Sequence, residues 1–117
     1  MSILEEITAL LNGMHIAVET GVFKNTAPQM YTVITPLSDV FELHADDMPH
    51  ADVQEARISL FTMANYMPLK NSIVEALLRG GFTITDRRYL GFETETGYHH
   101  YAIDAAKQYD FELEETQ

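Results

Sequence analysis

The sequence contains no cysteine and few basic residues. Without cysteine, the chain has no disulfide framework, no thiolate nucleophile and no zinc–thiolate site. Lysine and arginine total 7 against 18 acidic residues, which gives a formal net charge of −11 at pH 7. Affinity for DNA and RNA depends on cations that displace counterions from phosphate, so this balance argues against nucleic-acid binding. It disfavours binding to an anionic membrane for the same reason. The simplest role of the acidity is to keep the protein soluble.

Long apolar runs are also absent. No stretch approaches the ~20 residues of a membrane-spanning helix, and the N-terminus carries Glu5 and Glu6 where a signal peptide carries basic residues. We therefore expect synthesis in a cytoplasm. The length of 117 residues, with 46% hydrophobic and 21% charged residues, fits a single globular domain over 1–117.

The clearest local pattern is a helix between Asn65 and Phe82. Asn65 suits the N-cap, Pro68 suits the first turn, and Gly80-Gly81 suits a left-handed stop. The predicted apolar stripe is Leu69, Ile73, Ala76 and Leu77, and the predicted polar side is Lys70, Asn71, Glu75 and Arg79. A helix of this length is marginal alone, so it needs a surface to pack on.

A second helix is predicted at the N-terminus, where Ser2 and Glu5 form a capping box and Asn12-Gly13 ends the apolar periodicity. Strands are predicted from residue composition and alternation. They are His15–Val18, Gln29–Thr35, Val40–Ala45, Val53–Thr62, Phe82–Phe92 and Tyr98–Ile103, the last continuing towards Leu113 past a bend near Ala105. Turns are expected at Pro36–Asp39, Asp46–Asp52 and Glu93–Gly97, and a loop at Gly21–Pro28.

Runs of strands joined by short turns predict the α+β class. We expect an antiparallel or mixed sheet with two helices packed on one face, in the order α-β-β-β-(β)-α-β-β. In Val53–Thr62, Ala56, Ile58 and Leu60 alternate with polar residues, which is typical of a sheet with one solvent-facing side.

The candidates for chemistry are weak. His44, Asp46, Asp47 and His50 contain ligand types for a divalent cation, but their spacing matches no established pattern. A solvated acidic hairpin tip is the favoured interpretation.

His99 and His100 are adjacent on a predicted strand, so they point to opposite faces and do not converge on one ion or substrate. We expect one to pack near Tyr101 and the other to meet water. Arg87-Arg88 alternates in the same way, and none of the serines lies in a nucleophile elbow. No nucleotide-binding glycine motif is present. We therefore assign no catalytic, cofactor-binding or metal-binding residue, and we predict that the protein is not an enzyme and has no cofactor.

The aromatic residues favour an interaction protein instead. A small two-layer domain buries only one side of its sheet, so some of the aromatic side chains on its strands should be exposed unless another subunit covers them. The strand aromatics in question are Tyr31, Phe41, Phe61, Tyr89, Tyr98 and Tyr101.

Three stretches carry a resemblance to a known family. PQMYTVITPLSDVFELHADD, EARISLFTMAN with the helix that follows it, and YLGFETETGYHHYAID resemble small tail proteins of tailed bacteriophages and prophages of Gram-positive bacteria. They span Pro28–Asp47, Glu55–Asn65 and Tyr89–Asp104, and the likeness extends from Ser2 to about Phe111.

This resemblance implies a non-enzymatic virion structural protein of the tail-completion, tail-terminator or head–tail joining type. It implies self-assembly into a ring, often sixfold, with tail-tube and connector proteins as partners. The implied location is the tail or head–tail interface of the virion, after synthesis in the bacterial cytoplasm. In such a ring, acidic turns at Asp46-Asp47 or Glu93–Glu95 facing the axis would let DNA slide without sticking.

Two alternatives stay open at this point. One is a small acidic host module that recruits a protein partner through an exposed sheet or edge. The other is a metal-dependent enzyme that uses His44 and His50.

Overall fold

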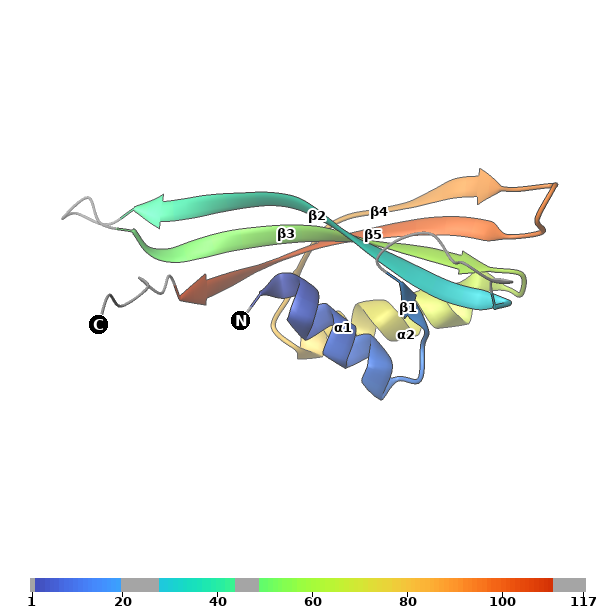
Figure 1. Ribbon diagram of the computed structural model, residues 1–117, viewed down its shortest axis with the longest axis horizontal. Coiled ribbons are helices and arrows are strands. Elements are labelled where there is room, and N and C mark those ends of the chain that lie inside the picture. The colour runs from blue at the N-terminus through green and yellow to red at the C-terminus, as the bar shows by residue number, and fades with distance from the viewer. Residues whose placement is uncertain (1, 20–27, 44–48, 111–117) are drawn as a thin grey trace.

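The computed structural model describes residues 2–19, 28–43 and 49–110, and it has an α+β fold (Figure 1). Along the chain the elements are α1 (Ile3–Gly13), β1 (Val18–Glu19), β2 (Met30–Leu43), β3 (Pro49–Thr62), α2 (Tyr66–Arg79), β4 (Thr83–Phe92) and β5 (His99–Asp110). The strands form one sheet in the order β1-β2-β3-β5-β4. β1 pairs with β2 in parallel and the other pairs are antiparallel, so the sheet is mixed.

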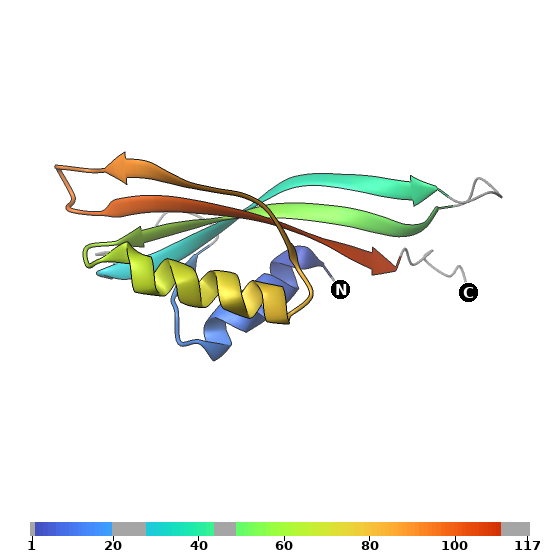
Figure 2. The same cartoon turned by 180° about the vertical axis from the view of Figure 1, so that it is seen from behind.

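Both helices lie on the same face of the sheet (Figures 1 and 2). α1 contacts β1, β2 and β3, whereas α2 contacts β4 and β5. Their apolar stripes meet the inward side chains of the strands, because alternate residues of a strand share one face. The fully buried aliphatic residues of this layer are Ile7, Leu11, Ile58, Leu60, Ile73, Leu77 and Ile103. The α+β class and the two predicted helices are confirmed.

The predicted helix ends are confirmed by their hydrogen bonds. The Ser2 side chain accepts from the backbone N–H of Glu5, and the Glu5 carboxylate accepts from the N–H of Ser2. At α2, the Asn65 side chain accepts from the N–H of Met67. Gly81, just past Gly80 at the C-cap, has a φ of 86°, a left-handed conformation that favours glycine.

Lys70 differs from the prediction. We expected it on the polar side of the second helix, but it is buried with Ile73 and Leu77. Three and seven residues separate it from those two, so it belongs to the same stripe. Its Nζ lies 5.6 Å from the centre of the Tyr101 ring, and its alkyl stem is the part that suits an apolar layer.

The region 29–45 also differs from the prediction, which divided it into two strands around a turn at Pro36–Asp39. The structure has one strand, β2, that runs through Pro36 to Leu43. The pairing with β3 shifts between Pro36 and Ser38, and proline is tolerated at such bulges and on strands near a sheet edge. The element order therefore differs in detail, since two predicted strands are one.

Three strand boundaries differ from the prediction as well. β1 begins at Val18 and not at His15, because His15 has a φ of 62° and belongs to the turn after α1. β3 begins at Pro49, four residues before the predicted start. β5 is continuous to Asp110 with no bend at Ala105; the irregularities lie on β4 instead, at Ile84/Asp86 and Tyr89/Gly91.

The outer halves of β2 and β3 and the end of β5 extend beyond the helices as a long arm (Figure 1). The molecule is accordingly elongated, with extents of 54 × 28 × 23 Å. Neither described helix is long and apolar enough to cross a membrane. The predicted strand Tyr109–Leu113 and the loop Gly21–Pro28 lie largely outside the described residues.

Candidate interaction surfaces

A row of rings crosses the face of the sheet that the helices leave open. Tyr31, Phe61 and His100 are paired in register across β2, β3 and β5. The ring centres of Tyr31 and Phe61 are 4.9 Å apart, and those of Phe61 and His100 are 4.2 Å apart, both in stacked geometry. Tyr98 meets Tyr31 edge-on at 5.4 Å. Such contacts hold the rings in place on a surface without a helix.

His100 ends this row beside Gly91, its partner on β4. The His100 Nε2 is buried and has no hydrogen-bond partner among the described residues. Burial lowers the pKa of His100, because the charged imidazolium is poorly solvated there. Nearby Arg57 acts in the same direction, and Glu93 opposes it.

A second aromatic cluster lies on the helix side. Tyr66, at the start of α2, stacks on Tyr89 at 5.0 Å and on Tyr101 at 5.4 Å. The Tyr89 hydroxyl is 3.0 Å from the Nδ1 of His99, and Phe92 lies 4.9 Å from the His99 ring. His99 and His100 thus join clusters on opposite faces, as the alternation predicted, and both are half-buried.

Large apolar side chains are exposed around this second cluster. In the register of the sheet, Thr62 of β3 pairs with His99, which pairs with Phe92, so the ends of β3 and β4 and the start of α2 come together. We call the exposed group at this end of the molecule the apolar end. Its members and their exposed fractions are Met63 (46%), Met67 (44%), Tyr89 (42%), Leu90 (45%) and Phe92 (51%).

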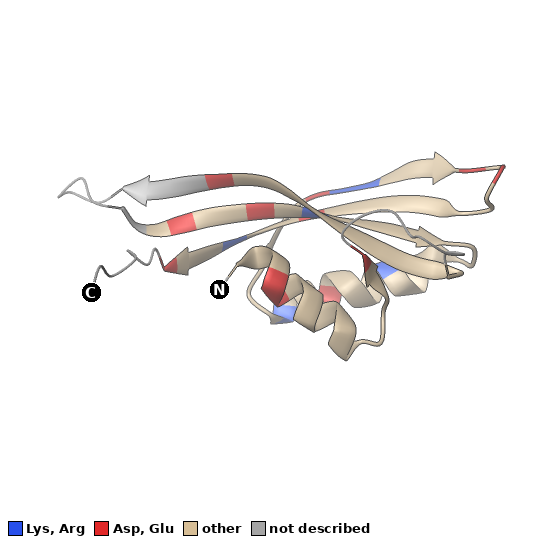
Figure 3. Cartoon of the chain, in the orientation of Figure 1, with Lys and Arg blue, Asp and Glu red and all other residues tan. Residues whose placement is uncertain are grey.

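The basic residues on the sheet are unequally partnered. Arg57 binds Asp104 through two hydrogen bonds of 2.8 and 3.0 Å, and Arg88 binds Asp86 at 2.7 Å. Arg87 is exposed and has no carboxylate partner among the described residues. Figure 3 shows basic residues on β3 and β4, and acidic residues along the arm.

The metal hypothesis gains no support from the described residues. His44, Asp46 and Asp47 lie outside them, as does the side chain of His50. Within the described residues, no group of three or more histidine, aspartate or glutamate side chains is placed to hold a metal ion.

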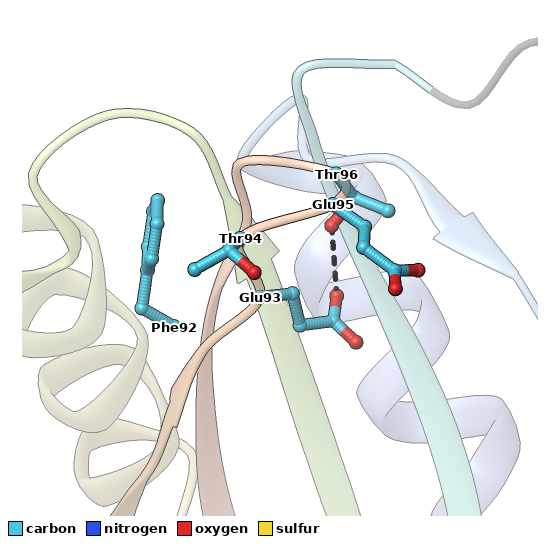
Figure 4. A pocket seen from close by; sticks show the side chains of 5 residues that line it. All are labelled: Phe92, Glu93, Thr94, Glu95 and Thr96. Atoms are coloured by element: carbon cyan, nitrogen blue, oxygen red, sulfur yellow. Dashed lines mark hydrogen bonds between the residues drawn. The ribbon is translucent and has the colours of Figure 1, made fainter.

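A hollow of about 320 Å³ lies at the β4–β5 turn and is lined by Phe92, Glu93, Thr94, Glu95 and Thr96 (Figure 4). The Thr96 hydroxyl donates to the Glu93 carboxylate at 3.1 Å. Glu93 and Glu95 lie on one side of the turn and Phe92 on the other. A single exposed turn forms this hollow, with no pair of groups from different elements to act on a bound molecule.

The prediction that some of the strand aromatics are exposed is confirmed at Tyr89. Tyr98 and Tyr101 are buried, and the side chain of Phe41 lies outside the described residues. The apolar end was missed because its members come from three elements that only the strand register brings together.

Searches against models of known protein families and against curated proteins find no match.

Proposed function

We propose that this chain is a non-enzymatic structural protein of a phage or prophage virion. In this proposal it is a tail-completion, tail-terminator or head–tail joining component that acts through self-assembly and protein–protein contacts. Its partners are further copies of itself, as a ring, and the tail-tube and head–tail connector proteins. The resemblance of Pro28–Asp47, Glu55–Asn65 and Tyr89–Asp104 to small tail proteins supplies the virion role.

One structural observation carries the part of the proposal that concerns protein contacts. The apolar end exposes five large apolar side chains at one end of the molecule, in a protein that is otherwise strongly acidic. Aromatic residues and methionine are enriched where proteins contact one another. A protein that stays soluble through its charge can carry such a surface until a partner covers it.

The acidity has a second use in this proposal. Glu93 and Glu95 are exposed at the β4–β5 turn, and a ring that turned them towards its axis would present carboxylates to passing DNA. Phosphate would be repelled, so the duplex would not adhere.

The deciding experiment is to purify particles from the source strain after induction and to quantify this chain by mass spectrometry. The proposal expects the chain in particles at a fixed ratio to the major tail protein. Deletion of its gene should leave heads and tails unjoined or tails of wrong length. Absence from particles, together with capture of a host protein by the tagged chain, would favour the host binding module instead.

A further inference from the structure

Arg87 is a cation without a carboxylate partner among the described residues. Acidic residues outnumber basic ones 18 to 7, and the other three arginines each have a carboxylate partner. Arg87 is exposed on β4, two to five residues from Tyr89, Leu90 and Phe92 of the apolar end. Arginine beside exposed aromatic residues is the composition found at energetically important interface positions.

The backbone of β4 is also unpaired on one side. β4 lies at the end of the strand order, and within the described residues it pairs only with β5. An edge strand presents N–H and C=O groups that can pair with another strand. The surface around Arg87 therefore offers backbone hydrogen bonds, a free cation and apolar contacts together.

A complementary edge lies on the other side of the same sheet. β1 covers β2 only at Thr32 and Val33, so the described residues leave the outer side of β2 without a strand from Ile34 onwards. Here Leu37 is 41% exposed and Asp39 is exposed. Figure 3 shows acidic residues on each of the three strands that form the described part of the arm. Its lysine, Lys107, is already bound to Glu6.

Strand direction and side-chain facing both permit these two edges to meet. Three successive antiparallel pairings make β4 antiparallel to β2, so a second copy in the same orientation continues the sheet with antiparallel pairing. The Gln54 side chain accepts from the N–H of Ile3 in α1, so Gln54 faces the helices. Asp39 is paired with Gln54 and therefore also lies on the helix side of the sheet. Arg87 pairs with the buried Ile103 and is on the helix side too.

We infer that the β4 edge of one copy pairs head-to-tail with the outer β2 edge of a second copy, with Arg87 opposite Asp39. This register also places Tyr89 opposite Leu37, and it ends just short of the residues that β1 covers. The inference rests on the proposed self-assembly and specifies its interface. Head-to-tail contacts of this kind generate rings when the rotation closes.

The experiment is a charge swap read by sedimentation velocity over a concentration series. Arg87→Glu and Asp39→Arg should each weaken self-association about ten-fold, because each opposes like charges at a close pair. The double variant Arg87→Glu/Asp39→Arg, and an equimolar mixture of the two single variants, should recover wild-type association. Arg79→Glu and Glu75→Arg, on the exposed side of α2, match the net charges of the single variants and should change little.

Cysteine cross-linking gives a second readout, because the native chain has no cysteine. In the inferred register, Ser38 lies opposite Arg88, and both are exposed. Ser38→Cys/Arg88→Cys should form a ladder of disulfide-linked dimers, trimers and larger species on oxidation. Each single variant has one cysteine and should form no species larger than a disulfide-linked dimer.

Three outcomes would overturn the inference. A wild-type protein that is monomeric throughout, with no ladder, would do so. So would an Asp39→Arg variant that associates normally. Recovery of Arg87→Glu by Glu93→Arg would indicate a two-fold β4–β4 contact instead. If association persists while the swap fails, self-assembly stands and only this interface is wrong; the virion role is decided separately by the composition of the particles.

Discussion

Arg57 and Asp104 face each other across β3 and β5 on the side of the sheet without helices, joined by two hydrogen bonds of 2.8 and 3.0 Å. The Asp104 side chain is 9% exposed and that of Arg57 is 35% exposed. The hydrogen bond and charge of Asp104 raise the pKa of Arg57. A charged pair with parallel hydrogen bonds in the middle of an open sheet fixes two neighbouring strands to each other.

Replacing Asp104 by alanine should therefore destabilise the protein. The guanidinium of Arg57 would lose both of its charge-assisted hydrogen bonds, which costs about 1–3 kcal/mol of unfolding free energy. Urea denaturation measures this change directly. Asp110→Ala is the matched control, because Asp110 is an exposed aspartate of the same strand. Equal stabilities of the two variants would show that the pair contributes nothing.

His100 predicts a pH dependence of stability. Its pKa is lowered in the folded protein, chiefly by burial, so the unfolded chain binds more protons than the folded one as pH falls through about 6.5. Stability should accordingly be full above that pH and should decrease as the pH falls below it. Measurements of unfolding free energy between about pH 5 and 8 test this.

The variant His100→Phe isolates the effect, because phenylalanine keeps the stack on Phe61 and cannot titrate. In this variant the unfolding free energy should no longer show the part of the decrease at acid pH that His100 causes. It should also be no less stable than wild type near neutral pH, since the imidazole Nε2 has no partner to lose among the described residues. An unchanged pH profile would assign the decrease to other groups.

Glycines at two helix ends give a matched pair of predictions. Gly81 has a φ of 86°, so alanine there should cost about 1–2 kcal/mol in backbone strain. Gly13 ends α1, and a Cβ there would meet no atom within 4 Å. Gly13→Ala should be neutral or slightly stabilising, because alanine allows the unfolded chain fewer backbone conformations than glycine does. Thermal unfolding of both variants tests the contrast, and equal shifts would contradict it.

Glu6 ties both helices to the sheet. Its carboxylate accepts from the Tyr109 hydroxyl at 2.9 Å and from the Lys107 ammonium, which also donates to the carbonyl of Gly80 at the end of α2. Burial and the bond to Glu6 raise the pKa of Tyr109. Glu6→Ala should therefore cost more than Tyr109→Phe, which removes one bond worth about 1 kcal/mol. Chemical denaturation ranks the two, with Glu95→Ala, in an exposed turn, as the control. A larger effect for Tyr109→Phe would contradict the ranking.

The sequence was most informative where local chemistry decides the structure. Ser2 and Asn65 cap their helices through bonds within three residues, and Ala56, Ile58 and Leu60 follow simple alternation. Lys70 was misplaced because the packing of α2 on the sheet overrode the charge of a single residue. Pro36 predicts a strand end, but β2 continues through it, because a position near a sheet edge tolerates the missing N–H.

The interaction surfaces were harder to predict because they depend on strand order. Alternation along β4 puts Asp86 and Arg88, two residues apart, on the same face, so this ion pair has a local signal. No local pattern shows that β4 lies at the end of the strand order, which places Arg87 at the sheet edge. Likewise, the apolar end needs the register that brings Thr62, His99 and Phe92 into one row. Non-local pairing of this kind has no signal in a single sequence.

A substitution at Leu90 tests self-association with little effect on folding. It is 45% exposed at an irregular position of β4, between Tyr89 and Gly91. Leu90→Ser should leave the unfolding free energy within about 0.5 kcal/mol of wild type, because an exposed side chain contributes little to the core. The same change should weaken self-association, since it removes apolar surface at the proposed contact.

Leu78→Ser is the matched control, because Leu78 is 56% exposed but lies on α2 and not on β4. It should alter neither property. Unfolding measured at low protein concentration and sedimentation measured over a concentration series report the two quantities independently. If both leucine variants associate as wild type does, exposed apolar surface on β4 has no part in assembly. If Leu78→Ser alone weakens association, the contact lies on the helix layer and the sheet edge is free.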